Sequence, residues 1–348
     1  MLSLFALAGA MSQFNQGLTL FLSLLVEATP FLLLGVAFSS LLAILVDERK
    51  LVALTPKNPV LAAIAGSLFG CLFPVCECGN VPVARRLLMQ GAPSALAIGF
   101  LLAAPTVNPI VFWATWVAFR DQPSMVFWRV GLTILISVII ACVFSVQKDL
   151  RPFLQPAIAR QLLPPEPEPA LATATSDSPL LTRGTYLLQS TGPVKLDQPL
   201  AMDMAVLPSA TWTVKAQAVL EMMLQEFREL GAVLVMGSAI AATVQVAIPR
   251  EWILALGQGP ITSILAMMLL AWVVSICSTV DSFFALSFAS IFTSGSILAF
   301  LVFGPMIDLK NISLLLTTFK SRAVIYLFVL AAQLTFVFTL AVNLYTSW

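Results

Sequence analysis

Phe100-Leu-Leu-Ala-Ala-Pro105-Thr-Val-Asn108 and Phe300-Leu-Val-Phe-Gly-Pro305-Met-Ile-Asp308 are two copies of one pattern, 200 positions apart. Each copy has an apolar run, then a proline, then an amide or acid three positions later. Proline ends or kinks a helix because it lacks the backbone N–H and its ring clashes with the preceding turn. The pattern therefore predicts a helix that breaks inside an apolar segment, once in each half of the chain.

The similarity between the two halves extends outward from this stretch. Cys76 and Cys277 lie 201 positions apart. Further pairs match at an offset of 202, namely Glu27 with Glu229 and Gly35 with Gly237. Two copies of one unit are implied. In a very apolar chain, internal duplication is typical of membrane transporters, whose substrate sites lie between the repeats near the bilayer midplane.

Composition places the chain in a membrane. Of its 348 residues, 59% are hydrophobic and 10% are charged, and the mean hydropathy is +0.96. Residues 92–119, 252–280, 282–307 and 323–348 contain no Asp, Glu, Lys or Arg. Each run exceeds the roughly 20 residues that a transmembrane helix needs. Only helices satisfy the backbone of such open-chain runs in lipid, so we expect an all-α polytopic membrane protein.

The expected spans are partly broken. Cys76 to Pro82 should not form a helix, because Pro74, Gly79 and Pro82 fall close together. Pro105 should divide residues 92–119 into a kinked helix or two half-helices. We expect about eight full spans plus re-entrant segments. Apart from residues 92–119, the main spans are expected at 18–46, 60–76, 130–146, 230–249, 260–277 and 323–345.

Three domains follow from the composition. Residues 1–146 form the first membrane repeat and residues 216–348 the second. Residues 147–215 hold ten of the 22 prolines and many of the charges, and are expected to form an exposed, flexible linker. We expect the two repeats to be inverted relative to each other. Arg120 and Arg129 fall in one predicted loop, and Lys310, Lys320 and Arg322 fall in another. This distribution leaves the orientation in the membrane open.

The absence of histidine excludes several classes of catalytic and metal site. It excludes the Ser-His-Asp triad, the His-Glu-x-x-His zinc site and the usual near-neutral proton relay. No Gly-x-x-x-x-Gly-Lys-Ser/Thr loop occurs either, so ATP hydrolysis within this chain is not expected. We expect no enzyme activity, no cofactor and no metal. Transport would be driven by a gradient or by a separate subunit.

The densest group of chemically active residues is Cys76-Glu77-Cys78-Gly-Asn80. In an extended segment, residues two positions apart face the same way, so Cys76 and Cys78 could converge on one ligand. Thiolates suit soft metals and thiophilic species, and Cys277 could supply a third sulfur. The alternative is that these cysteines pack as small apolar residues.

Acids and amides complete the predicted site. Glu77 and Asp281 are acids inside otherwise apolar stretches, and an ionisable group at such depth by default marks an ion or substrate pathway. Either could load and release a proton, or could simply pair with Arg85, Arg86 or a helix N-terminus. Asn108 and Asp308 could bind substrate or cap the half-helix that follows each proline.

These stretches also resemble a known family. The relevant segments are Cys76-Glu-Cys-Gly-Asn-Val-Pro82-Val-Ala-Arg, Gly91-Ala-Pro93, Phe100 to Pro109 and Cys277-Ser-Thr-Val-Asp281-Ser-Phe-Phe-Ala285. They resemble the bacterial predicted permeases that include the ArsP-type organoarsenical efflux permeases. The resemblance implies a multi-spanning inner-membrane permease, with export of trivalent organoarsenicals known for one branch. That family usually has a small residue between the two cysteines, where this chain has Glu77.

The leading hypothesis is a secondary permease of the plasma (inner) membrane, exporting a small thiophilic or anionic solute with possible proton coupling. Its expected partners are a small molecule or ion and the lipid bilayer, with no nucleic acid. Its site is predicted at Cys76, Glu77, Cys78, Asn80, Asn108, Cys277, Asp281 and Asp308. A non-transporting scaffold or assembly factor that uses the central linker is the alternative. A membrane-embedded thiol redox enzyme is a weaker third, because Cys-x-Cys is not the usual Cys-x-x-Cys dithiol.

Overall fold

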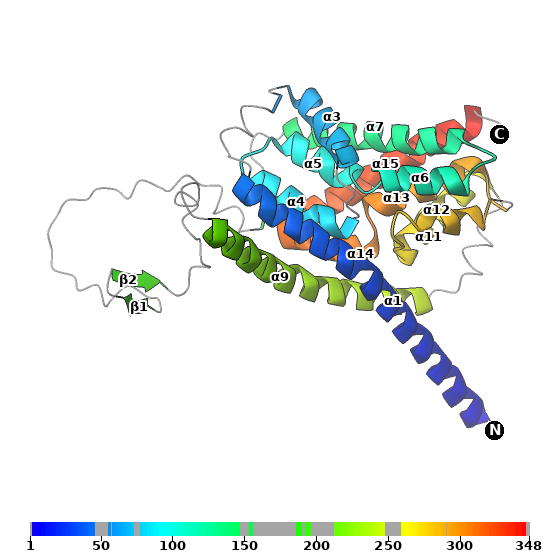
Figure 1. The fold of residues 1–348 in the computed structure, drawn as a ribbon. Helices are drawn as coiled ribbons and strands as arrows, with labels where there is room; N and C mark the ends of the chain where they lie inside the picture. Colours follow the sequence, from blue (N-terminus) through cyan, green and yellow to red (C-terminus); the bar gives the residue numbers. More distant parts are fainter. Residues whose placement is uncertain are drawn as a thin grey trace.

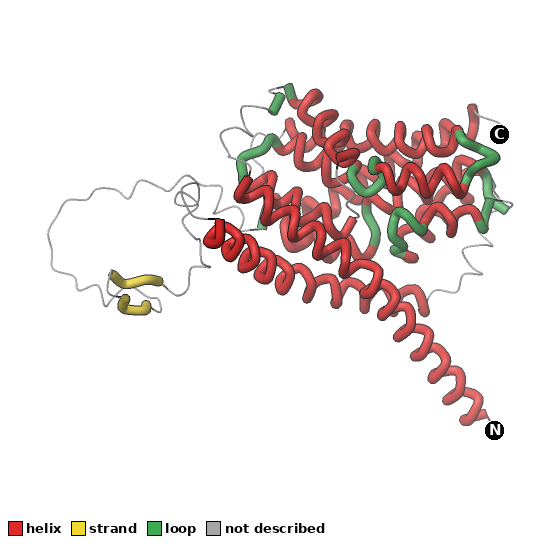
Figure 2. Tube along the Cα trace, viewed as in Figure 1, coloured by secondary structure: helices red, strands yellow, loops and turns green. Residues whose placement is uncertain are grey.

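The fold is built almost entirely of helices (Figures 1 and 2). The computed structural model describes residues 2–45, 55–56, 58–72, 77–146, 153–155, 186–189, 192–195, 212–247, 259–289 and 291–345. The first half contains α1 (Leu2–Leu45), α3 (Pro59–Phe69), the short 3-10 helix η1 (Gly70–Leu72), α4 (Glu77–Met89), α5 (Ser94–Ala103), α6 (Pro109–Ala118) and α7 (Ser124–Val146). The second half contains α9 (Trp212–Ala247), α11 (Pro260–Val274), α12 (Asp281–Leu286), α13 (Ser294–Met306), α14 (Leu309–Thr318) and α15 (Ser321–Tyr345).

The two halves repeat the same order of long and short helices. A long first helix (α1 or α9) is followed by short helices and closed by a long last helix (α7 or α15). Figure 1 shows α1 and α9 side by side and running in opposite directions, and α7 and α15 also run in opposite directions. Opposite directions for matched helices are what an inverted repeat requires. An inverted relation is consistent with the duplication, but the duplication does not depend on it. The inverted arrangement stays a prediction.

The predicted all-α polytopic class is confirmed. Five helical segments of the described residues are long and apolar enough to cross a membrane, namely Phe14–Leu41, Ser124–Val146, Val219–Val246, Ser294–Thr318 and Ser321–Tyr345. Four apolar helices, α3, α5, α6 and α11, are shorter. At 1.5 Å per residue, a ten-residue helix covers only about 15 Å of a hydrocarbon core about 30 Å thick. Short helices thus take the place of some of the expected eight full spans.

Local sequence explains where the half-helices begin and end. α5 ends at Ala103, just before Pro105, and α6 begins at Pro109, where a proline fits the first helical position. The Asn108 side chain caps α6 by accepting a hydrogen bond from the Val111 amide at 2.9 Å. The predicted division of residues 92–119 at Pro105 is therefore confirmed.

One local prediction is wrong. Residues 77–82 were expected to be non-helical, but α4 is helical from Glu77 to Met89 and contains Pro82. A proline inside a helix removes one backbone hydrogen bond, and the packing of α4 against α1, α5 and α14 outweighs that loss. The argument that residues two positions apart face the same way does not apply within this helix, where successive side chains are about 100° apart.

Two glycines that match between the halves, Gly35 and Gly237, allow close packing of α4 and α14, the helices that carry the candidate site. A Cβ at Gly35 of α1 would collide with the backbone of Gly79 in α4. A Cβ at Gly237 of α9 would lie 2.9 Å from the Ser313 hydroxyl of α14. Because α4 also packs on α14, these contacts hold α1, α4, α14 and α9 together. The pair Gly35 and Gly237 was matched in the sequence, and the two residues have equivalent packing roles.

The linker region is described only in part. Tyr186–Gln189 (β1) and Gly192–Lys195 (β2) form an antiparallel hairpin, pairing Tyr186 with Lys195; it lies apart from the helices in Figure 2. Residues 153–155 instead dock on the junction of α14 and α15, where Leu154 is 1% exposed and the Lys320 amide donates to the Phe153 carbonyl at 2.8 Å. For these three residues the expectation of an exposed linker does not hold.

Candidate functional site

The first buried polar cluster lies where α4 meets α14, at the contact of one repeat with the other. Glu77 is the first residue of α4, and Lys310 lies in the first turn of α14. The Glu77 Oε1 atom lies 3.2 Å from the Lys310 ammonium, and both side chains are at most 2% exposed. Asp308 Oδ2 lies 4.0 Å from the same ammonium. We call Glu77, Asp308 and Lys310 the α4/α14 cluster.

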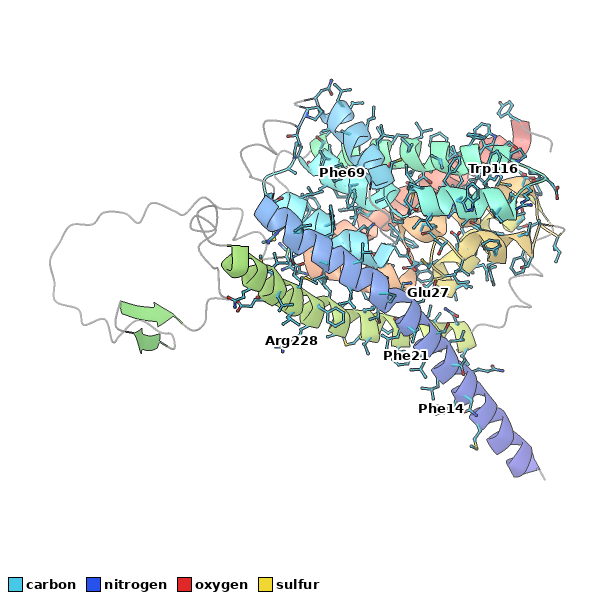
Figure 3. The ribbon with its side chains drawn as sticks, in the orientation of Figure 1. Phe14, Phe21, Glu27, Phe69, Trp116 and Arg228 are labelled. Carbon is cyan, nitrogen blue, oxygen red and sulfur yellow. The ribbon has the colours of Figure 1, made fainter. Side chains whose placement is uncertain are left out.

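Two sulfurs lie beside this cluster. Cys78 and Cys277 are 1% and 2% exposed, and both are within electrostatic range of the Lys310 ammonium. Glu27, half-buried on α1, contacts Cys277 and interacts electrostatically with Lys310 and Glu77. Figure 3 shows Glu27 on the part of α1 that lies beside the bundle, whereas Phe14 lies on the part that extends beyond it. Cys76 lies outside the described residues.

Several buried oxygens around the α4/α14 cluster have no donor in the described part of the chain. They are Glu77 Oε2, Asp308 Oδ2, Asn80 Oδ1 and Asn311 Oδ1. Each belongs to a side chain that is at most 1% exposed. Leaving such an atom unpaired costs about 1–3 kcal/mol. A site with several unpaired acceptors is suited to a ligand or proton that supplies donors.

The remaining bonds of these residues are structural. The Asp308 side chain accepts a hydrogen bond from the backbone N–H of Asn311 and so caps α14, as Asn108 caps α6. Asn80 donates to the Leu101 carbonyl at 2.6 Å and thereby ties α4 to α5. Capping is therefore realised for both Asn108 and Asp308. The second carboxylate oxygen of Asp308 remains available to the cluster. The side-chain amide of Asn108 instead donates hydrogen bonds to the carbonyls of Ala104 and Pro105, each at 3.3 Å.

A second buried cluster lies where α12 meets α6 and α7. The Arg129 guanidinium of α7 lies 2.7 Å from Asp281 Oδ2, and these side chains are 1% and 3% exposed. Arg129 also donates to the hydroxyls of Thr115 (2.8 Å) and Ser282 (2.7 Å) and to the Ser278 carbonyl (3.3 Å). The Ser282 hydroxyl donates to Asp281 Oδ1 at 3.2 Å. Both carboxylate oxygens of Asp281 are thus satisfied.

The two clusters are reciprocal. Glu77 of the first repeat pairs with Lys310 of the second, and Asp281 of the second repeat pairs with Arg129 of the first. Each acid is the first residue of its helix, α4 in one repeat and α12 in the other. They differ in bonding: Asp281 faces one cation and both its carboxylate oxygens accept hydrogen bonds, whereas Lys310 faces two buried carboxylates that each retain an oxygen without a donor in the described part of the chain.

The structure therefore groups Glu77, Cys78, Cys277 and Asp308 at one cluster and places Asp281 at the other. Sequence reasoning missed the two cations, Lys310 and Arg129, because both were assigned to loops. A usable signal was present for Lys310, which follows the matched Asp308 by only two positions. Arg85 and Arg86, proposed as partners for Glu77, instead contact Glu229 at 3.0 Å and the Met222 sulfur at 3.2 Å.

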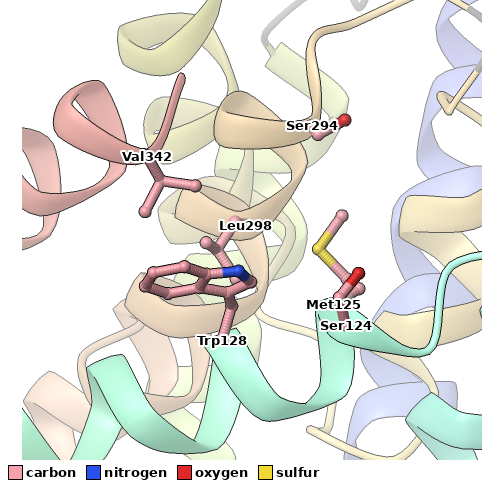
Figure 4. Close-up of a pocket in the computed structure, with 6 residues that line it drawn as sticks. All are labelled: Ser124, Met125, Trp128, Ser294, Leu298 and Val342. Atoms are coloured by element: carbon pink, nitrogen blue, oxygen red, sulfur yellow. The ribbon is translucent and has the colours of Figure 1, made fainter. Parts of the chain in front are cut away.

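Two cavities of the molecule lie away from these clusters. One, of about 10 Å³, is lined by Ser124, Met125, Trp128, Ser294, Leu298 and Val342 (Figure 4). That volume corresponds to about one water molecule. The other, of about 300 Å³, is a mainly apolar groove between α1 and α9 with Arg228 at its edge. Neither includes a predicted site residue.

Comparison with known proteins gives a consistent picture. The model of the family described as "Predicted permease" (ArsP_1) matches residues 13–344. The chain is 39% identical to the UPF0718 protein YcgR of Bacillus subtilis (strain 168), over 91% of this chain and 94% of that one. It is 30% identical to a "Putative two-component membrane permease complex subunit" of Streptococcus mutans serotype c, over 89% of each chain. No solved structure matches.

Proposed function

Because the chain belongs to the family of predicted permeases and is a multi-pass bacterial membrane protein, we propose that it is a secondary permease that exports a small thiophilic solute. The carrying observation is the reciprocal pair of buried ion pairs at the contacts between the repeats. Intramembrane ionisable groups are costly and typically mark a transport pathway. No ATP-binding loop occurs in the sequence, so a gradient or a separate subunit would drive the movement.

A thiophilic solute fits the α4/α14 cluster better than an anionic one. One ammonium faces Glu77, Asp308 and half-buried Glu27, so acids outnumber the cation. The acids already engage the ammonium, so the cluster offers no spare cation to pair with an added anion. The buried thiols Cys78 and Cys277 offer soft sulfur donors instead. A trivalent organoarsenical is the solute class that both the thiols and the family resemblance favour.

The chemistry of such binding is balanced without an oxidant. A trivalent methylated arsenical carrying two hydroxyl groups would form one arsenic–sulfur bond with each thiol. Each bond releases one water, made from an arsenical hydroxyl and a thiol proton, and arsenic stays trivalent. Release reverses these steps. Coupling to a proton gradient through a buried acid would make the cycle directional.

The test is transport by the purified protein in liposomes with an imposed pH gradient, using a trivalent methylated arsenical. Cys78→Ser and Cys277→Ser should each abolish the gradient-dependent flux, because serine oxygen is a poor arsenic ligand. Cys142→Ser is the matched control: Cys142 is half-buried on α7, away from the cluster, and its loss should leave the flux unchanged. Flux that persists in both site variants would overturn the thiophilic assignment.

A second candidate is a subunit of a larger assembly. The relative from Streptococcus mutans is named as a complex subunit, which favours a partner for this chain as well. Deleting residues 160–205 separates the alternatives. A self-sufficient permease should keep its flux, whereas a subunit or scaffold that docks through the linker should lose a co-purifying partner and its function together.

A further inference from the structure

We propose that the α4/α14 cluster holds one proton, shared by Glu77 and Asp308 and carried by Asp308 in the state seen here. That this is the coupling proton rests on the proposed permease function. The existence of the proton does not, and it can be tested without a transported solute.

The charges of the cluster carry the argument. Glu77 and Asp308 are each 1% exposed, and Lys310 is 2% exposed. If both acids were ionised, two negative charges would face one ammonium, leaving one negative charge buried without a partner. An uncompensated buried charge is strongly destabilising. Binding one proton makes the cluster neutral and turns one unpaired acceptor oxygen into a donor.

Geometry assigns the proton to Asp308. Glu77 Oε1 lies 3.2 Å from the ammonium, whereas Asp308 Oδ2 lies 4.0 Å from it. The closer carboxylate benefits more from remaining charged. A proton on Oδ2 of Asp308 also preserves the cap, because the other oxygen, Oδ1, accepts the hydrogen bond from the Asn311 amide. The site can therefore load a proton without releasing the start of α14.

Other titratable groups do not change this balance of charges in the α4/α14 cluster. In the described part of the chain, Glu27, Cys78, Cys277 and Asp281 also interact with Lys310 or its partner acids. The charge of Asp281 is matched by Arg129. Glu27 Oε1 is buried and has no donor in the described part of the chain; if Glu27 is ionised it adds a further negative charge and strengthens the need for a proton, and if it is protonated it adds no charge. The thiols are neutral when protonated. On α9, which packs against α14, Glu229 pairs with Arg85 and Glu226 interacts with Arg86. On α15, Arg322 is exposed.

Two alternatives to a proton on the α4/α14 cluster are disfavoured: a metal cation at this cluster, and a proton on Asp281. A metal cation would replace or repel the Lys310 ammonium, and the described residues contain no group of three or more acidic or sulfur side chains arranged to hold one. Asp281 is a poor proton carrier here, because its charge is matched one-to-one by Arg129 and both its oxygens accept hydrogen bonds. The shared proton therefore belongs to the first cluster and not to the second.

The test is infrared spectroscopy of the reconstituted protein near neutral pH. A protonated carboxylic acid has a C=O stretching band that an ionised carboxylate lacks. Glu77→Gln and Asp308→Asn should each abolish one such band, because either change leaves a neutral ion pair. Lys310→Met should double the band, because both acids must then bind a proton. Glu77→Gln combined with Lys310→Met should restore the wild-type intensity.

Glu229→Gln, which removes the acid of an exposed ion pair, is the matched control and should not alter this band. Asp281→Asn should not alter it either, because Arg129 matches the charge of that acid. Thermal unfolding of each variant checks that it is folded. If one single variant does not fold, the double variant still tests the number of protons bound by the cluster. A wild-type spectrum without the band, or a band that survives Glu77→Gln, would overturn the proposal. A band without arsenical flux would retain the proton site and remove the proposed function; flux without the band would do the reverse.

Discussion

Residue by residue, the two buried ion pairs have different bonding. Arg129 makes its contacts with a fork of donors that reach an acid, two hydroxyls and a carbonyl. A guanidinium suits such a fixed network, whereas an ammonium is a compact point charge that can exchange partners. Lys310 lies between two acids within 4.0 Å. We infer that the Arg129 cluster favours rigidity and the Lys310 cluster favours a change of state.

The first prediction concerns Asp281. Replacing Asp281 with Asn should destabilise the protein by about 3–5 kcal/mol, because Arg129 would remain buried without a counter-ion. Replacing Arg129 with Met and Asp281 with Leu together should recover most of that loss. Thermal unfolding in detergent, followed by tryptophan fluorescence, measures both.

An exposed ion pair provides the comparison for this prediction. Arg85 and Glu229 lie 3.0 Å apart, with side chains 17% and 46% exposed. Glu229→Gln should cost at most about 1 kcal/mol, because solvent screens such pairs. Equal losses in the single and double variants of the buried pair would show that Arg129 and Asp281 are not energetically coupled.

Among the helices, close approach depends on small residues. Gly66 of α3 lies against the Leu96 carbonyl of α5, where an added Cβ would collide with backbone. Gly70, four positions later, lies against the backbone of Ala104. The small-x-x-x-small pattern at Gly66 and Gly70 thus marks a helix contact, as is common in membrane proteins.

The second prediction compares two glycines. Gly66→Ala should destabilise the protein by about 1–3 kcal/mol through overpacking of α3 against α5. Gly131→Ala, on α7, is the matched control because no atom lies within 4 Å of the added Cβ. It should leave stability unchanged or raise it by about 0.5–1 kcal/mol, since alanine favours helix more than glycine does. The unfolding midpoints of the two variants in detergent decide the matter; equal midpoints would contradict it.

For the whole molecule, the arrangement suggests that transport moves one repeat relative to the other. α4 of the first repeat packs on α14 of the second, and α12 of the second repeat packs on α6 of the first. A covalent link across either contact should therefore stop the cycle. A link within one repeat should not.

The third prediction uses two pairs of touching hydroxyls. Thr115 and Ser282 belong to different repeats and their oxygens lie 3.0 Å apart. With cysteines at both positions and exposed Cys71 replaced by serine, oxidation should abolish flux and a reductant should restore it. Ser67 and Ser137, 2.9 Å apart within the first repeat, provide the control pair. Oxidation of that pair should leave flux unchanged, and flux that survives the cross-repeat link would contradict relative movement of the repeats.

The sequence by itself determined the features that depend on a few neighbouring residues. Long charge-free runs required membrane helices, Pro105 indicated a kink or a break within residues 92–119, and Asn108 and Asp308 were candidate caps. The duplication was also visible, because matched positions keep a nearly constant offset. The local prediction that was wrong, the non-helical segment over residues 77–82, concerned a proline that tertiary packing tolerates.

Only the tertiary structure decided which charges meet. Glu77 and Lys310 are 233 positions apart, and Arg129 and Asp281 are 152 positions apart. Hydropathy assigned both cations to loops, since a charge in an apolar chain is most simply placed in water. Their burial depends on acids that the other repeat supplies once α4 packs on α14 and α12 packs on α6. A helix cap needs only adjacent residues, whereas a buried ion pair needs two distant segments to desolvate each other's charges.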